Sequence, residues 1–243
     1  MDFNPALLIS GVVILLCGGL VYLLGQAHRK LATLIETMQV TPVASVTPGF
    51  VEVKGRAKGA RPLLVSPLTA KPCVYFRFLV EEQVKRGKST YWRTVIDDQQ
   101  ECGLVLEDMH QGSIAVNLRD AQLMLNPDVH LRSGFLNDAP PGVEATLQRY
   151  GQSSQGLVFN KSMRYAETVL EENDQIHVLG MAQGREGKMV IDRGGEVFIV
   201  SDQPEEVLTR SLHRKQTVRS VIAALIGLVG AGLCWLSVMV GRV

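Results

Sequence analysis

The sequence lacks the residue spacings that usually hold metal ions in proteins. Its four cysteines include no Cys-x-x-Cys pair, and its five histidines form neither a His-x-His nor a His-Glu-x-x-His pattern. Zinc sites with the usual ligand spacings are therefore excluded. We expect neither a metal nor a cofactor.

Signatures of nucleic-acid binding and of common enzyme classes are missing as well. The 25 Lys and Arg residues nearly balance the 24 Asp and Glu residues, so no excess of positive charge attracts a nucleic acid. No serine lies in a Gly-x-Ser-x-Gly pattern. No glycine-rich turn precedes a predicted helix as phosphate-binding loops do. The protein is therefore expected to bind no nucleic acid and to belong to none of these enzyme classes.

Charge is also absent from two long stretches near the ends of the sequence, residues 3–27 and 220–241. Each stretch supplies the roughly 20 apolar residues that a helix needs to cross the hydrocarbon of a bilayer. We predict transmembrane helices over 6–25 and 220–241. A secretory signal peptide is the alternative for the first stretch, but the residues before it are not basic and no convincing cleavage site follows.

Basic residues gather at the inner ends of the two predicted spans, where they mark the cytoplasmic side of a membrane. Arg242 alone lies on the outer side. We therefore expect a bacterial inner-membrane protein with two spans and a cytoplasmic central domain. In that compartment Cys73 and Cys102 should be free thiols, with a disulfide between them as the alternative. The inner basic residues are Arg29, Lys30, Arg210, Arg214, Lys215 and Arg219.

The second predicted span contains small residues at every fourth position, at Ala223, Gly227 and Ala231. This spacing places them on one helical stripe, where another helix can approach closely. Its partner would be the first span or a second subunit in a homo-oligomer. Alternatively, these residues only reflect the ordinary glycine and alanine content of membrane helices.

The central residues predict a mainly β domain. Residues 26–49 should continue the first span as a helix and then form a linker broken by prolines and a glycine. Residues 50–203 should form the β-rich domain, with a short helix at 141–150, and residues 204–219 should form a second juxtamembrane helix. Strands are expected at 51–57, 73–84, 91–96, 104–107, 114–118, 129–131, 165–170, 176–182, 188–191 and 197–200.

Two of these strands share one pattern. Residues 51–59 and 176–184 both read aliphatic-x-Val-x-Gly-x-Ala-x-Gly. Glycine within a strand lets a sheet bend, as a small barrel requires. We predict the α+β class, mainly β, with a barrel-like domain built from distant halves between two transmembrane helices; chance similarity is the alternative. Strand alternation places Ile176 and Val178 inside and His177 on the opposite face.

One compact basic cluster, Lys85, Arg86 and Lys88, lies between two predicted strands and is followed by Tyr91 and Trp92. A hairpin tip commonly carries solvated charge without further function. The alternative is contact with membrane lipid, to which each basic residue near an anionic surface contributes about 1 kcal/mol, or with a membrane or peripheral protein partner. These five residues are the candidate contact site.

Several motifs follow one another in a specific order between the spans. A Val-x-Gly-x-Ala strand precedes Ser66-Pro67 and Cys73-Val74-Tyr75, and Arg-Tyr-x-Glu at 164–167 leads to Asp-x-Ile-x-Val-x-Gly at 174–180. In this order the chain resembles the GIDE-type domain, also called the beside-a-membrane (BAM) domain, of mitochondria-anchored RING ubiquitin ligases and many bacterial proteins. The resemblance implies a domain between two spans that engages partner proteins.

The family name suggests an E3 ubiquitin ligase, yet a RING needs eight Cys or His ligands, with spacings that this sequence lacks. We therefore expect a non-catalytic, membrane-anchored interaction or scaffolding module. The alternative is an uncharacterised membrane enzyme or ligand-binding β-barrel in which Asp108, His110 and Glu167 gather in a cleft. The Asp-Met-His-Gln-Gly segment at 108–112 is explained more simply as a hairpin turn.

Overall fold

The computed structural model describes residues 5–134, 139, 142–156, 160–194, 197–203 and 205–240 of the chain. They belong to two compact units: one contains the two terminal helices, and the other comprises Gln39–Gln203. The helices carry the apolar stretches of the sequence, and the second unit contains all of the strands.

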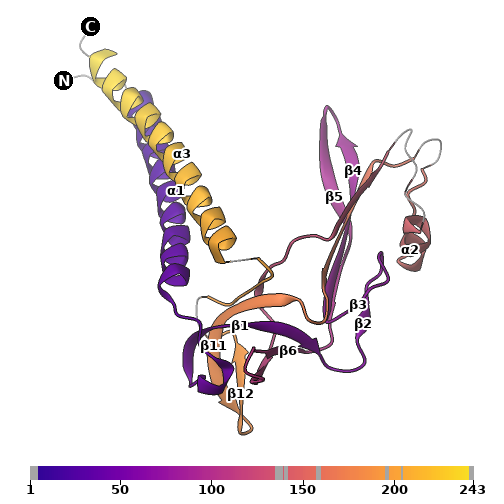
Figure 1. Cartoon of the computed structure of the whole chain (residues 1–243). Helices are drawn as coiled ribbons and strands as arrows, with labels where there is room; N and C mark the ends of the chain where they lie inside the picture. The colour runs from indigo at the N-terminus through magenta and orange to yellow at the C-terminus, as the bar shows by residue number, and fades with distance from the viewer. Residues whose placement is uncertain are drawn as a thin grey trace. The chain divides into compact units, whose positions relative to one another are not determined.

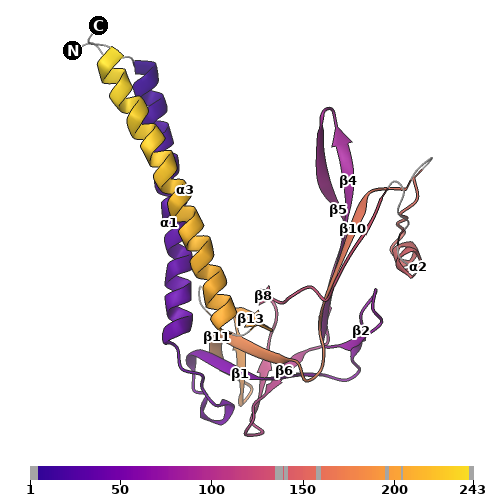
Figure 2. The same cartoon turned by 45° about the horizontal axis from the view of Figure 1, so that its top comes forward.

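The first unit is a pair of long helices, α1 (Pro5–Thr37) and α3 (Glu205–Val240), which lie side by side (Figures 1 and 2). Within them, Pro5–Gln26 and Gln216–Met239 are long and apolar enough to cross a membrane. Leu16 and Leu228 are about 70 % exposed. Such exposure is unfavourable in water and is suited to the hydrocarbon of a bilayer.

Both helices extend beyond the predicted spans. α1 continues to Thr37, and a short 3-10 turn, Val43–Ser45, follows in the linker. The predicted juxtamembrane helix and second span are one continuous helix, α3, because no proline interrupts the segment between them. The basic side chains of Arg29, Lys30 and Lys215, which supported the predicted orientation, lie outside the described residues, as does Pro204.

The second unit contains a closed five-stranded barrel. β11 pairs with β1 and thereby closes the ring, and every pair in the ring is antiparallel except β7–β12. Counted along the chain, the third and fifth strands of the barrel form this parallel pair, and the cyclic order is the topology of the OB-fold. In order around the barrel the strands are β1 (Gly49–Gly59), β6 (Leu104–Glu107), β7 (Ser113–Val116), β12 (Lys188–Asp192) and β11 (Gln175–Arg185).

The repeated glycine pattern occurs on β1 and β11, the two strands that close the barrel. A Cβ atom on Gly55 would lie 2.3 Å from the carbonyl oxygen of Glu107, and one on Gly180 would lie 2.7 Å from the ring of Phe198. Neither position has room for a side chain, because the backbone of β6 approaches Gly55 and the side chains of Phe198 and Ile191 approach Gly180. The barrel predicted from two distant halves of the sequence is therefore confirmed.

A four-stranded antiparallel sheet forms the other half of this unit. One face of it packs with α2 (Val143–Arg149) around a second apolar core that includes Phe78, Tyr165 and Leu147. The helix is shorter than predicted, and Pro141 at its expected start lies outside the described residues. The strands are, in order, β5 (Ser89–Glu101), β4 (Tyr75–Arg86), β10 (Met163–Leu170) and β9 (Val129–Ser133).

Two short strands, β8 (Gln122–Met124) and β2 (Leu64–Val65), were not predicted, and each pairs with a strand that overlaps a predicted one. β8 pairs with β13 (Ile199–Ser201), which in turn pairs with β11 at the edge of the barrel. β2 and β3 (Pro72–Cys73) form a two-residue ladder. Segments of two or three residues are too short to show the alternation that identifies a strand.

His177 lies on the opposite face of β11 from Ile176, as alternation predicts, but this face is also covered. His177 is buried next to the fully buried Glu52, with 3.6 Å between its Nδ1 and Glu52 Oε1. β13 pairs with β11 at His177. The segment before β1 pairs with β1 itself, through Val40 and Glu52. Within the described part of the chain, both Glu52 carboxylate oxygens and His177 Nδ1 lack a hydrogen-bond partner.

Candidate interaction site

The β4–β5 hairpin projects beyond the sheet that supports it. β10 pairs with β4 from Tyr75 to Glu82, whereas β4 and β5 continue to pair with each other up to Arg86 and Ser89. Residues 83–92 therefore form a two-stranded extension, here called the arm (Figures 1 and 2). Gly87, with φ of +62°, adopts the left-handed conformation that its tight turn requires.

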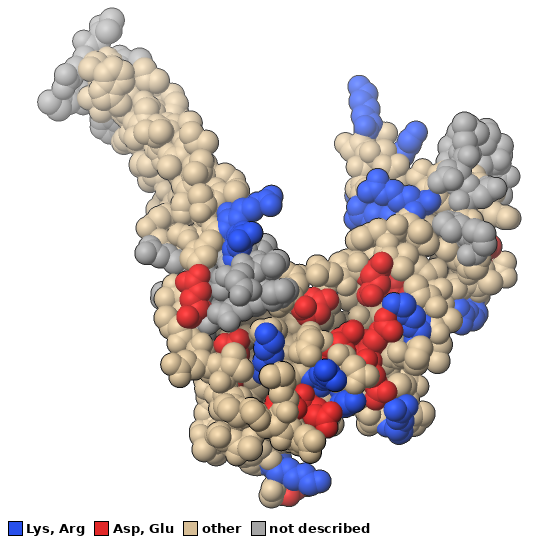
Figure 3. Space-filling model, in the orientation of Figure 1, with Lys and Arg blue, Asp and Glu red and all other residues tan. Residues whose placement is uncertain are grey.

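The tip of the arm is basic and solvent-exposed. Lys85, Arg86 and Lys88 are exposed, and the arm contains no acidic residue. Within the described residues, none of these three cations belongs to an ion pair. On the face drawn in Figure 3, blue groups mark the projecting tip and no red group lies beside them.

The acidic groups nearest the arm are already paired. Arg164 Nε lies 2.5 Å from Glu81 Oε2, and Arg93 Nη2 lies 2.8 Å from Glu82 Oε2. The hydrogen bond from Arg164 holds the pKa of Glu81 below its ordinary value. These carboxylates are thus neutralised by other cations, and the charge of the tip remains uncompensated.

Two aromatic residues lie where the arm meets the sheet. Tyr91 is opposite Val84 and is 48 % exposed. Trp92 is opposite Gln83, on the other face, and is half-buried beneath Arg164, whose guanidinium carbon is 4.5 Å from the centre of the indole ring. The structure therefore brings all five predicted contact residues onto one arm, with cations at the tip and aromatic rings behind them.

The helix pair packs through small residues that recur every seven positions. A Cβ atom on Gly230 would lie 2.9 Å from Leu15 Cγ and 3.0 Å from the Gly11 carbonyl oxygen, so the helices touch closely there. Contacts every seven residues are typical of helices that cross at a shallow angle. The buried small residues are Gly11, Gly18 and Gly25 on α1 and Ala223, Gly230 and Ser237 on α3.

Two members of the predicted four-residue stripe lie near Gly18 of the first helix: a Cβ atom built on Gly18 would be 3.4 Å from the Ala223 carbonyl oxygen and 3.5 Å from the Gly227 nitrogen. A Cβ atom on Gly227 would meet nothing within 4 Å, and Ala231 is exposed. A step of four residues rotates the contact by about 40° around the helix, so the stripe turns away from its neighbour. Packing of Gly227 and Ala231 against a second subunit stays a prediction.

Asp108 and His110 belong to the turn between β6 and β7. Asp108 accepts hydrogen bonds from the backbone N–H groups of Val43, His110 and Gly112, at 2.8 to 2.9 Å. The bond from Val43 contributes most to a pKa of Asp108 below its ordinary value. The Asp108 carboxylate thus holds the linker against the barrel at Val43 and stabilises the turn at His110 and Gly112.

Glu167 lies in β10, in the other sheet, and is fully buried. It accepts hydrogen bonds from the backbone N–H groups of Leu68, at 2.6 Å, and Thr69, at 3.0 Å. Among the described contacts, none joins Glu167 to Asp108 or His110, so the predicted cleft is not assembled. The Arg-Tyr-x-Glu motif drew attention to Glu167 in the sequence. Only the structure shows that the Glu167 carboxylate holds the 66–71 loop through these hydrogen bonds.

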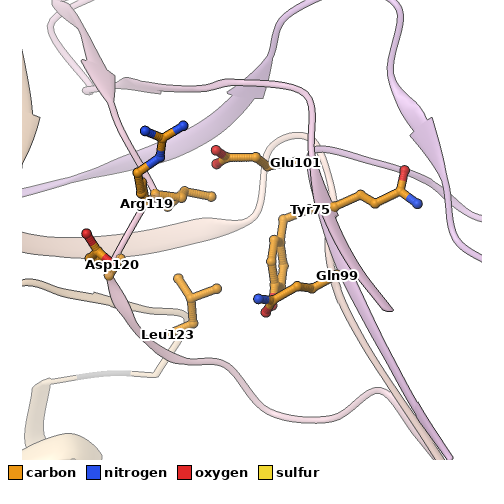
Figure 4. Close-up of a pocket in the computed structure, with 9 residues that line it drawn as sticks. Tyr75, Gln99, Glu101, Arg119, Asp120 and Leu123 are labelled. Carbon is orange, nitrogen blue, oxygen red and sulfur yellow. The ribbon is translucent and has the colours of Figure 1, made fainter. Parts of the chain in front are cut away.

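A polar pocket of about 450 Å³ lies between β5 and the connection from β7 to β8. Figure 4 shows Tyr75, Gln99 and Glu101 on one side and Arg119 with Asp120 on the other. Burial raises the pKa of the Glu101 carboxyl group, although Arg119 opposes this shift. The described residues contain no group of three or more His, Cys, Asp or Glu arranged to hold a metal ion.

Cys73 and Cys102 are neighbours and both are free thiols. Cys102 Sγ lies 3.9 Å from the backbone oxygen of Cys73. Burial raises the pKa of the Cys73 thiol to about 11. A thiol in this environment is mostly protonated at neutral pH and is a poor nucleophile.

Comparison with known proteins identifies a family for this chain. A family model described as "GIDE: E3 Ubiquitin ligase" matches residues 77–236, from β4 through most of α3. This range includes the arm, four of the five barrel strands and the second apolar helix. No curated protein and no solved structure matches the chain.

Proposed function

The chain belongs to the GIDE family, and on that premise we propose that it is a membrane-anchored, non-catalytic interaction or scaffolding module. The arm is the observation that carries this proposal. An exposed element with uncompensated charge and accessible aromatic rings is suited to contact with another molecule. The family description relates the chain to proteins associated with E3 ubiquitin ligases, while the ligase reaction itself is not part of this proposal.

The helix pair supports the anchoring part of the proposal. Two apolar helices that touch closely at glycines suit a hairpin that crosses a bilayer and returns. Such an anchor confines the β domain to a thin layer beside the membrane. A domain held there meets membrane-bound partners at a high effective concentration.

The inner membrane of a bacterium, with the β domain in the cytoplasm, is the location we propose. A reporter that is active only outside the cytoplasm should be active when fused after residue 243. It should be silent when inserted into the β11–β12 turn between Glu186 and Gly187, an exposed tip. The reverse pattern would place the β domain on the outer side.

Cross-linking mass spectrometry in native membranes tests the interaction role. We expect exposed lysines of the β domain, such as Lys54 and Lys188, to cross-link reproducibly to one or a few membrane or peripheral proteins. If the domain cross-links only to itself or to other copies of the chain, a scaffolding role for other proteins is wrong.

The pocket beside β5 favours a second candidate, a ligand-binding β domain. It joins an aromatic ring, amides and both signs of charge in one place, which suits a small polar ligand. A metabolite that raises the melting temperature of the wild-type chain but not of the Glu101→Ala variant would support this candidate. If no metabolite in a broad set shifts the wild type, the candidate fails.

A further inference from the structure

We propose that the arm docks on an anionic lipid surface, with Lys85, Arg86 and Lys88 at the lipid phosphates and Tyr91 and Trp92 at the interface. This inference rests on the proposed function, because it names what the contact element of that module binds. The surface that the arm binds is the headgroup layer of a membrane that contains anionic phospholipid.

The charge of the arm matches such a surface. Three exposed cations lie within four residues, and the nearest carboxylates, Glu81 and Glu82, are bound to Arg164 and Arg93. The tip therefore presents an uncompensated charge of about +3. Each basic residue near an anionic leaflet strengthens binding by about fivefold, so three contribute about 100-fold.

The aromatic residues suit the layer just beneath the phosphates. Tyr and Trp are enriched at membrane interfaces, because their rings are apolar while their OH or NH groups remain able to bind water. The exposed ring of Tyr91 extends the apolar surface of Val84 on one face of the arm. Arg164, whose charge is paired with Glu81, stacks on the ring of Trp92 on the other face.

The distribution of charge favours a lipid surface over an acidic protein. Strand alternation places Lys85 on the face of Trp92 and Arg86 on the face of Tyr91. A protein surface that covers one face of a flat ribbon would leave the cations of the other face unpaired. Mobile headgroups surround a tip that enters them and neutralise both faces at once. The two apolar helices of the same chain would keep such a surface within reach.

Fluorescence quenching in the full-length chain tests the proposal. The protein contains two tryptophans, Trp92 and the 60 % exposed Trp235 of α3, so Trp235→Phe leaves Trp92 as the only indole. This variant is reconstituted into vesicles of phosphatidylcholine, with or without phosphatidylglycerol. In both cases part of the phosphatidylcholine carries bromine near the headgroup, which quenches nearby tryptophan.

We expect quenching of Trp92 in vesicles that contain phosphatidylglycerol, little in pure phosphatidylcholine, and a decrease with added salt. The triple variant Lys85→Ala, Arg86→Ala, Lys88→Ala should weaken docking by about 100-fold. The matched control replaces Lys54, Arg56 and Lys188, three exposed basic residues of the barrel, with alanine. This control removes the same charge, and the fluorescence of its Trp92 should be quenched as strongly as in the parent protein.

Absence of Trp92 quenching in the anionic vesicles overturns the proposal. The proposal is also overturned if the barrel control variant loses as much quenching as the triple variant of the arm. Cross-links from the arm to an acidic protein, without quenching in anionic vesicles, would also overturn it while leaving the interaction role intact. Conversely, quenching that depends on the arm, in a chain that cross-links to no other protein, would uphold lipid docking and refute the scaffolding role.

Discussion

Replacement of Gly230 by alanine should weaken the association of α1 and α3, whereas replacement of Gly227 should not. The added methyl group at Gly230 would lie 2.9 Å from Leu15 Cγ, 3.0 Å from the Gly11 carbonyl oxygen and 3.1 Å from Leu15 N. Two of these three atoms belong to the backbone and cannot rotate away. The helices must therefore move apart or the contact must distort.

The magnitude follows from the difference between the two sites. Overpacking a tightly packed contact by one methyl group typically costs about 1–3 kcal/mol. A change from glycine to alanine also favours the helix by about 1 kcal/mol, but this gain is common to both sites. The free energy of helix association should thus be about 1–3 kcal/mol less favourable in Gly230→Ala than in Gly227→Ala.

Energy transfer between the helices measures this difference. Leu24 and Val221 are each more than 50 % exposed, so a donor and an acceptor can be attached to single cysteines at these positions. The four native cysteines are first replaced by serine. Separation of the helices is then followed as the mole fraction of denaturing detergent is raised in mixed micelles, for the parent protein and both variants.

Equal effects of the two substitutions would refute the reasoning, because only one of the two added methyl groups meets the opposite helix. A larger effect at Gly227 would show that the four-residue stripe, and not the seven-residue repeat, forms the contact.

Three further predictions concern the β domain. Ile176→Ala should lower the free energy of unfolding by about 2–5 kcal/mol, because the side chain is fully buried in the barrel, and denaturant titration would measure it. The lowered pKa of Asp108 means that its carboxylate stabilises the fold above its ordinary pKa of 3.8, and that this stability is lost as the pH falls through the lowered value. Asp108→Asn should therefore be less stable than wild type at neutral pH, and the gap in melting temperature should narrow on acidification; a constant gap would contradict this. Glu167→Gln should speed hydrogen exchange of the 66–71 loop amides that the carboxylate holds, while those of α2 stay protected.

His177 and Glu52 show where strand alternation is insufficient. Alternation gives the face of a strand on which a side chain lies, and Ile176 and His177 do lie on opposite faces. Whether the second face is solvated depends on what covers it. Here His177 and Glu52 lie against each other, with 3.6 Å between His177 Nδ1 and Glu52 Oε1, although they are far apart in the sequence.

Local periodicity was enough to predict the two apolar helices, the mainly β class and the barrel. An apolar run, an alternation and a repeated glycine spacing each follow from the shape of a single helix or strand. The basic cluster at Lys85, Arg86 and Lys88 was also visible in the sequence, as was its position in a turn. The projection of this cluster beyond the sheet was not visible in the sequence, because it depends on how far β10 extends beside β4.

Only the tertiary structure decided which small residues bring the two helices together. Gly11, Gly18 and Gly25 recur every seven residues in the printed sequence, yet Gly227 and Ala231 fit a repeat of four equally well on one helix alone. The difference arises because two helices that cross at a shallow angle meet every seven residues, whereas a four-residue stripe turns away. A contact between two elements depends on the geometry of both, and a single element's sequence contains only half of that information.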